Sequence, residues 1–202
     1  MGEMSMKFIN RVVFAFCLTA ALGAYGQDRT AVETAEVGVQ TLLQTIAANE
    51  QYFASDRSRY FNAIEQVLES FVDFDAVATV VMSRYAQQAS QEQITRFGEI
   101  LKSTLTRFYG ASMVDYTNEE LVFLPERRQG DSPRSDRIVS MELRGDSQLR
   151  VQYQMFLNDN DEWKLKNINL AGINLGRQYY SQFSALMSEY NNDIDQVLAN
   201  WQ

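Results

Sequence analysis

The chain has 202 residues, of which 46% are hydrophobic, and its formal net charge at pH 7 is −8. An acidic protein is repelled by nucleic acids and by anionic membrane surfaces, so neither is expected as a partner. The sequence has no histidine and a single cysteine, which excludes Ser-His-Asp and Cys-His catalytic systems and the usual zinc sites. We therefore expect a protein that is not an enzyme and that binds no metal ion.

The first residues have the layout of a secretory signal peptide. Lys7 and Arg11 form a short basic stretch, residues 12–22 are an apolar run, and Ala24-Tyr25-Gly26 is a small-x-small cleavage site. The apolar run is too short to span a hydrocarbon layer of about 30 Å. The single cysteine lies inside this run, so the mature chain should have no disulfide. We assign residues 1–26 to a signal peptide and expect no stable membrane insertion of the mature protein.

The first half of the mature chain has helical periodicity. Apolar residues spaced three and four apart predict helices at about 29–50 and 57–71 and a third helix around 77–85. The segment Ser-Gln-Glu-Gln at residues 90–93 is a capping box, which predicts the start of a fourth helix. Apolar residues recur along that fourth helix as far as Phe108.

Beyond about residue 119 the apolar period changes to two. Alternating segments predict strands at 121–124, 139–143, 149–155 and 163–170, and Gly145-Asp146 predicts a hairpin turn between the middle two. Each longer segment has one apolar and one polar face. This alternation is typical of an antiparallel sheet with one face on the core.

Helical spacing returns at the C-terminus, from Phe183 to Trp201. Helices segregated from consecutive strands indicate an α+β fold. We expect a helical N-terminal half and a C-terminal helix packed on an antiparallel sheet of about four strands. The sequence has no internal repeat and no linker, so residues 27–202 should form a single domain.

Two segments stand out for their composition. Residues 158–162, NDNDE, are rich in oxygen ligands, but they lack the glycine and glutamate of a calcium-binding EF-hand loop, and Asn and Asp favour a tight turn. Residues 170–183, LAGINLGRQYYSQF, link a predicted strand to a predicted helix and carry only one charge. Together with the aromatic and methionine residues on the inward faces, this apolar link is compatible with an ordinary core or with a hydrophobic cavity.

Two long runs, VDFDAVATVVMSRYAQQASQEQITRFGEILKSTLTRFYG at 72–110 and DEWKLKNINLAGINLGRQYYSQFSALMSEYNNDIDQVLANW at 161–201, carry recognisable motifs. The first has an aspartate before a helix and then a stripe of aromatic and aliphatic residues. The second has a Trp-Lys strand, a glycine-aliphatic loop and an aromatic helix start. In these motifs and their order the chain resembles the MlaC, or toluene-tolerance, family of periplasmic phospholipid-binding proteins. Ser83 stands where many members have glycine.

The resemblance implies a domain whose core opens into an apolar cavity for acyl chains, with phospholipid as cargo and no cofactor. It implies a carrier in the periplasm that shuttles lipid between an inner-membrane ABC-transporter complex and an outer-membrane lipoprotein-porin complex and so maintains lipid asymmetry. The residues that we expect to line the lipid-binding pocket are Val81, Tyr85, Phe97, Leu101, Leu105, Phe108, Tyr109, Met113, Val139, Met141, Val151, Tyr153, Ile173, Leu175, Tyr179 and Phe183. In the apolar link, Gly172 and Gly176 should let the backbone bend.

Two alternative functions remain open from the sequence. One is a small α+β hydrolase or isomerase that acts on apolar substrates with a carboxylate base such as Asp115. The other is a lipid-independent periplasmic adaptor, in which the aromatic residues form a closed core. A continuous cavity would distinguish the carrier from the adaptor.

Overall fold

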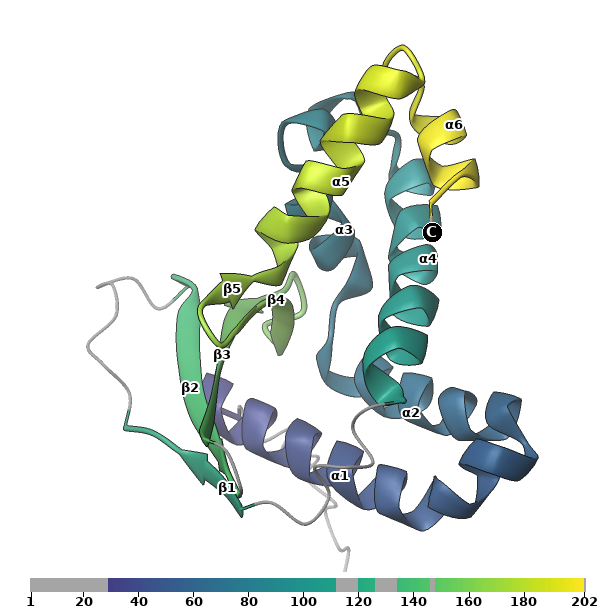
Figure 1. Cartoon of the computed structure of the whole chain (residues 1–202). Helices are drawn as coiled ribbons and strands as arrows, with labels where there is room; N and C mark the ends of the chain where they lie inside the picture. The colour runs from purple at the N-terminus through teal and green to yellow at the C-terminus, as the bar shows by residue number, and fades with distance from the viewer. Residues whose placement is uncertain (1–28, 112–119, 126–133, 146–147, 202) are drawn as a thin grey trace, which may run out of the picture.

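The computed structural model describes residues 29–111, 120–125, 134–145 and 148–201 (Figure 1). Its helices are α1 (Ala31–Ser55), α2 (Arg57–Phe71), α3 (Phe74–Met82), the 3-10 helix η1 (Ser83–Gln88), α4 (Gln91–Gly110), α5 (Leu175–Glu189) and α6 (Ile194–Ala199). Its strands are β1 (Glu120–Phe123), β2 (Arg137–Arg144), β3 (Gln148–Leu157), β4 (Trp163–Leu170) and β5 (Ile173–Asn174). The predicted α+β fold is confirmed, whereas the predicted signal peptide lies outside the described residues.

The strands form one antiparallel sheet in the order β1-β2-β3-β4-β5. Tyr153 on the central strand β3 lies between Val139 on β2 and Ile168 on β4. Side chains alternate between the two faces of a strand, so these three residues share one face. The four predicted strands are confirmed, and the fifth, β5, follows β4 through a turn in which Ala171 and Gly172 have φ of 50° and 86°.

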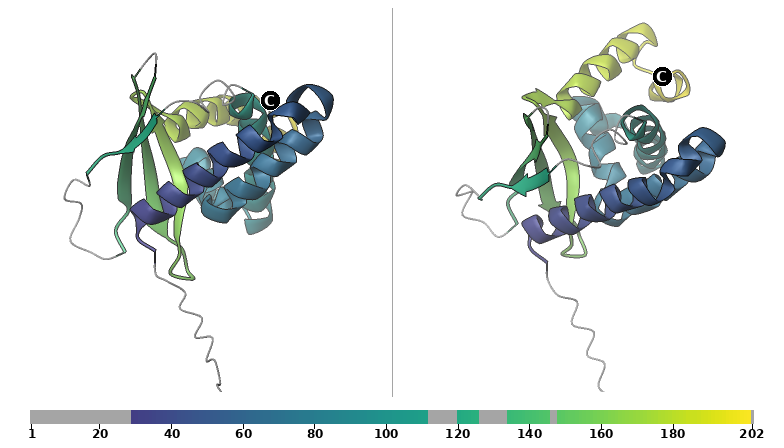
Figure 2. Two further views of the ribbon diagram at one scale, coloured as in Figure 1. Left: turned by 90° about the horizontal axis from the view of Figure 1, so that it is seen from below. Right: turned by 60° about the horizontal axis from the view of Figure 1, so that its bottom comes forward.

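Figures 1 and 2 show the helices gathered on one side of the sheet. Helix α1 runs across the sheet and forms a hairpin with α2, while α3 packs against both α4 and α5. Helix α6 folds back beside α4 at the end of the molecule that is farthest from α1. The apolar face of the sheet is therefore enclosed by two groups of helices, the α1–α2 hairpin and the group of α3 to α6.

Side-chain caps fix where several helices begin. The predicted capping box at the start of α4 is confirmed, because Ser90 Oγ accepts from the backbone N–H of Gln93 while Gln93 Oε1 accepts from the backbone N–H of Ser90. Asp56 and Asp73 cap α2 and α3 without a reciprocal bond, since one carboxylate oxygen of each accepts from a backbone N–H of the first turn. The turn predicted at 158–162 is also present, with Asn158 Oδ1 accepting from two backbone N–H groups.

Two predicted helices differ from the structure. The third helix stops at Met82, because Ser83 has φ of 51° and ψ of −118°, a conformation that cannot continue an α-helix. The C-terminal helix starts at Leu175, earlier than expected, and it ends at Glu189. The chain then reverses at Asn191 and Asn192, whose φ angles are 53° and 64°, and continues as α6.

The buried residues form three clusters. The upper core, between α3, α4, α5 and α6, contains Ala78, Val81, Met82, Tyr85, Phe97, Leu101, Phe183, Met187, Ile194, Val197, Leu198 and Trp201. The sheet core, between the sheet, α1 and the end of α2, contains Ala31, Ala35, Val39, Phe71, Val139, Met141, Val151, Tyr153, Met155 and Leu165. The hairpin core of α1 and α2 contains Leu42, Ile46, Tyr60 and Ile64.

A candidate ligand-binding cavity

A cavity of about 420 Å³ lies where the three cores meet. This volume falls within the range of about 300–1,000 Å³ that is typical of small-molecule sites. The cavity wall is formed by residues of α1, α2, α3, α4 and α5 and by all the long strands, and most of these residues are apolar. The structure thus contains a continuous hollow inside an apolar core.

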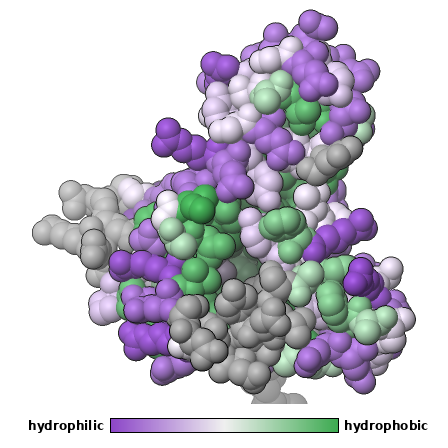
Figure 3. Space-filling model, in the orientation of Figure 1, coloured by the Kyte–Doolittle hydropathy of each residue, from purple (hydrophilic) through white to green (hydrophobic). Residues whose placement is uncertain are grey.

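The cavity opens on the face of the molecule that Figure 3 shows. Hydrophobic residues gather in the middle of this face, between the sheet and α4 (Figure 3). Phe108 on α4 lines the cavity and yet is 69% exposed, so it lies at the rim. A large aromatic side chain in this position gives an apolar edge to the opening.

Ten of the sixteen residues expected in the pocket line this cavity. They come from three helices of the upper group and from two strands, although they are far apart in the sequence. They are Val81, Leu101, Leu105, Phe108, Tyr109, Met141, Val151, Tyr153, Leu175 and Tyr179. Met113 lies outside the described residues.

Three of the expected residues fill the upper core instead of lining the cavity. The Phe97 and Phe183 rings are 5.1 Å apart, and the Phe97 and Trp201 rings are 4.9 Å apart. Tyr85 packs on Phe183 at 5.8 Å, and its hydroxyl lies 3.2 Å from Ser184 Oγ. Because α6 folds back onto α4, these aromatic side chains meet one another in a packed, buried cluster.

Two further residues also lie away from the cavity. Val139 is only 1% exposed and belongs to the sheet core, where the start of α1 covers it. Ile173 is 56% exposed, because it lies on the two-residue edge strand β5 just after the Ala171-Gly172 turn. The expectation that Ile173 faces the interior was therefore wrong.

Helices α1 and α2 supply a part of the wall that the apolar periodicity did not predict. These lining residues are Val39, Leu42, Leu43, Ile64, Leu68 and Phe71. The adjacent pair Leu42 and Leu43 was the available signal, because two consecutive apolar residues widen a helical stripe beyond what one packed face requires. Leu42 is buried in the hairpin core, and both leucines line the cavity.

The two glycines of the apolar link between β4 and α5 have different roles. Gly172 forms the turn with a φ of 86°. Gly176 lies inside the first turn of α5, where a Cβ atom would be 2.6 Å from Val80 Cγ1. Gly176 therefore allows α5 to approach α3 closely, and it does not bend the chain as expected. Leu175 and Tyr179, which lie on one face of α5, line the cavity.

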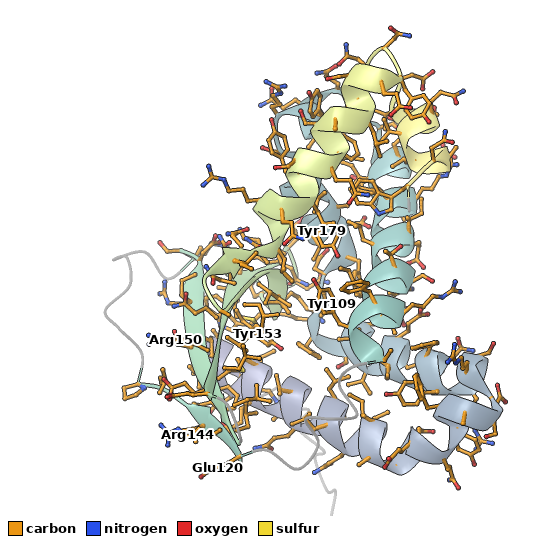
Figure 4. All side chains as sticks on the ribbon, in the orientation of Figure 1. Tyr109, Glu120, Arg144, Arg150, Tyr153 and Tyr179 are labelled. Atoms are coloured by element: carbon orange, nitrogen blue, oxygen red, sulfur yellow. The ribbon has the colours of Figure 1, made fainter. Side chains whose placement is uncertain are left out.

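Three tyrosines bring hydroxyl groups to the cavity from three different elements. Tyr109 on α4, Tyr153 on β3 and Tyr179 on α5 converge on the space between the sheet and the helices (Figure 4). Burial, together with a hydrogen bond to Tyr109, raises the pKa of Tyr179. Burial raises the pKa of Tyr153 to about 12. Both phenols are therefore neutral near pH 7.

Lys166 is the one charged residue among the described lining residues. Its Nζ lies 2.8 Å from Asp136 Oδ2, so this charge already has a carboxylate partner. The neighbouring Asn167 is also fully engaged, since its Oδ1 accepts from two backbone N–H groups and its Nδ2 donates to Gln154 and Asn174. The described wall therefore offers an apolar ligand no uncompensated charge.

Comparisons with known proteins agree with this architecture. The sequence model of the family described as MlaC protein matches residues 36–202. The toluene tolerance protein ttg2D of Pseudomonas putida is 30% identical over 162 residues, which are 79% of this chain and 74% of that protein. A phospholipid-binding protein from Ralstonia solanacearum, solved in complex with a phospholipid, has a similar fold, with a TM-score of 0.75 and 23% identity over 85% of this chain and 94% of that chain. The chain described here belongs to the MlaC family.

Proposed function

We propose that this protein is a non-enzymatic carrier that holds phospholipid acyl chains in its cavity. The cavity is the observation that carries the proposal. It has a volume of about 420 Å³, and its described lining is apolar except for a few neutral or ion-paired groups. Such a wall can replace the hydrocarbon of a bilayer around an acyl chain. The similar fold of a Ralstonia solanacearum protein in complex with a phospholipid supports this assignment.

The free energy of lipid transfer explains why such a carrier is useful. Each methylene moved from hydrocarbon into water costs about 0.8 kcal/mol, so one chain of ~14 methylenes costs on the order of 11 kcal/mol. Unassisted desorption is therefore slow. A cavity as apolar as the bilayer makes uptake and release nearly equal in free energy, and the transfer is then reversible without any chemical reaction.

We further place this carrier in the periplasm, between an inner-membrane ABC-transporter complex and an outer-membrane lipoprotein-porin complex. Its transport of phospholipid between them would maintain the lipid asymmetry of the outer membrane. The signal-peptide layout of residues 1–26 and the family membership support this location. In the described part of the chain, no helix has the length and apolar character needed to cross a membrane.

The two alternative functions have less support. The hydrolase or isomerase needs a carboxylate at the cavity, and the described lining residues include none, while Asp115 lies outside the described residues. The lipid-independent adaptor needs a closed aromatic core. That description fits the upper core around Phe97 and Phe183, but not the cavity beside it.

A charge placed in the cavity tests the proposal. Leu175→Arg and Val151→Glu each put an ion against the apolar wall, whereas Ile173→Arg puts the same arginine two residues away on an exposed position. After incubation with vesicles of phosphatidylethanolamine and phosphatidylglycerol, each protein is re-isolated and its bound lipid phosphorus is measured. A buried unpaired charge costs several kcal/mol, so both cavity variants should hold at least about ten-fold less lipid.

The control decides how the loss is interpreted. Ile173→Arg should carry as much phospholipid as the wild-type protein, and all the variants should keep the wild-type circular dichroism spectrum. If Leu175→Arg and Val151→Glu stay folded and carry the wild-type amount of lipid, the cavity does not hold the acyl chains.

A further inference from the structure

The hydroxyl group of Tyr153 is an exception on the apolar wall. Tyr153 lies on the central strand β3 between Val151 and Met155, is 8% exposed and lines the cavity. No other described residue forms a hydrogen bond with its hydroxyl, and burial alone raises the pKa of this phenol. Buried phenol groups normally have a hydrogen-bond partner, because an unmade bond is costly in a region of low dielectric constant. This hydroxyl is therefore suited to a partner that arrives with the ligand.

The other polar groups of the described wall are already engaged or closed off. Tyr109 and Tyr179 lie close enough for their phenol groups to interact with each other, and Tyr109 has a further partner. Lys166 is paired with Asp136. Thr106 Oγ1 has no partner, but it is sealed from solvent. On the sheet side of the described wall, Tyr153 is therefore the hydrogen-bond donor that remains available to a ligand.

The chemistry of this donor limits what it can bind. Burial raises the pKa of Tyr153 to about 12, so the group is a neutral O–H donor at physiological pH. A phosphate group would require positive charge beside it, and Lys166, the one charged residue among the described lining residues, already has its counter-ion. A neutral carbonyl oxygen needs one donor and no counter-ion. In a phospholipid, the neutral carbonyl groups are those of the acyl esters, where the apolar chains begin.

We propose that Tyr153 is a specificity-determining residue whose hydroxyl donates a hydrogen bond to an acyl-ester carbonyl of the bound lipid. The cavity then prefers ester-linked lipids to ether-linked lipids with the same chains and headgroup. This inference rests on the proposed carrier function, since it names a contact within the same cavity.

A competition between two matched lipids tests the inference. Vesicles contain equal amounts of a diacyl phosphatidylcholine and of the dialkyl ether phosphatidylcholine with the same chain length. The protein is incubated with these vesicles and re-isolated, and the two lipids bound to it are quantified by mass spectrometry. One hydrogen bond to a neutral acceptor predicts a preference of about two- to ten-fold for the diacyl lipid.

Two variants that each lack one tyrosine hydroxyl test whether Tyr153 causes the preference for the diacyl lipid. Tyr153→Phe removes the proposed donor and should bring the ratio of diacyl to dialkyl lipid to about one, as expected for the loss of one hydrogen bond. Tyr180→Phe removes a hydroxyl from the side of α5 that packs on Tyr85, away from the cavity, and should keep the wild-type ratio.

The outcomes separate this inference from the proposed function. Equal uptake of the two lipids by the wild-type protein, or an unchanged preference in Tyr153→Phe, overturns the role of Tyr153 and leaves the carrier function intact. Uptake of neither lipid overturns both. If Tyr153→Phe fails to fold, equal uptake of the two lipids by the wild-type protein still overturns the inference.

Discussion

The side-chain oxygen of Asn167 accepts a hydrogen bond from the backbone N–H of Gly176 over 3.0 Å. Asn167 lies on β4 and Gly176 lies in the first turn of α5, so this bond joins the sheet to the helix along one wall of the cavity. A Cβ atom on residue 176 would lie 2.8 Å from this oxygen and 2.6 Å from Val80 Cγ1. The close approach of three elements at this point therefore requires glycine.

Gly176→Ala should destabilise the protein, because the added methyl group must displace Val80 or break the bond to Asn167. Overpacking of this kind costs about 1–3 kcal/mol, and each kcal/mol lowers the Tm of a chain of this size by roughly 2–4 °C. Thermal unfolding followed by circular dichroism measures the effect. Gln178→Ala, at an exposed position of the same helix, should leave the Tm unchanged. Equal Tm values for wild type and Gly176→Ala would show that the structure accommodates the added methyl group without loss of stability.

Ser83→Gly should stabilise the protein. Ser83 has φ of 51° and ψ of −118°, a conformation that glycine adopts without strain and that costs other residues about 1 kcal/mol or more. Chemical unfolding in urea should show a gain of about 1 kcal/mol. Ser188→Gly, at an exposed position inside α5, should instead lose roughly 0.5 kcal/mol from lower helix propensity. Similar losses in both variants would contradict the strain at Ser83.

Phe183→Ala should destabilise the protein more than Leu105→Ala, because Phe183 lies in the packed upper core and Leu105 lines the cavity. Phe183 is fully buried among aromatic rings, so its truncation should lower the free energy of unfolding by about 3–5 kcal/mol. Leu105 lines the cavity and is only partly buried, so its truncation should cost only about 1 kcal/mol. Urea unfolding of lipid-free protein gives both values. Equal costs would mean that the two positions are packed alike.

Tyr153→Phe should change how stability depends on alkaline pH. Burial raises the pKa of Tyr153 from its ordinary value of 10.0 to about 12. The unfolded chain loses this proton first, so the contribution to stability is complete below pH 10 and is lost as the pH rises from 10 towards 12. Between pH 9 and pH 11 the wild-type protein should lose about 1 kcal/mol more than Tyr153→Phe, which is roughly half of the about 3 kcal/mol that the full rise of this pKa represents. Urea unfolding at pH 9 and pH 11 measures the difference, and parallel losses would contradict the burial of this phenol.

Much of the fold follows from local patterns in the sequence. The periods of apolar residues predicted α2, α4 and the four long strands, because each of these elements buries one regular face. The breaks at Ser83 and at Asn191 were missed. A left-handed residue is fixed by how the flanking helices pack, and serine or asparagine at such a site leaves only a weak signal in the sequence.

The cavity could be predicted only in part, because periodicity shows which face of an element is buried and not what that face meets. Phe97 and Leu101 lie on the same face of α4, yet Phe97 packs on Phe183 while Leu101 reaches the cavity. The difference depends on α6, which folds back over one end of α4. The contribution of Leu42 and Leu43 depends likewise on the α1–α2 hairpin, a tertiary contact that the sequence pattern does not contain.

Native mass spectrometry of the wild-type protein, purified from bacterial cells without detergent, tests the carrier function most directly. The spectrum should contain the mature chain with phospholipid bound in stoichiometric amount, and collisional activation should release the lipid for identification. The protein, once stripped of lipid, should take up phospholipid again from vesicles. A preparation that is free of lipid when isolated and that extracts none from vesicles would contradict the account.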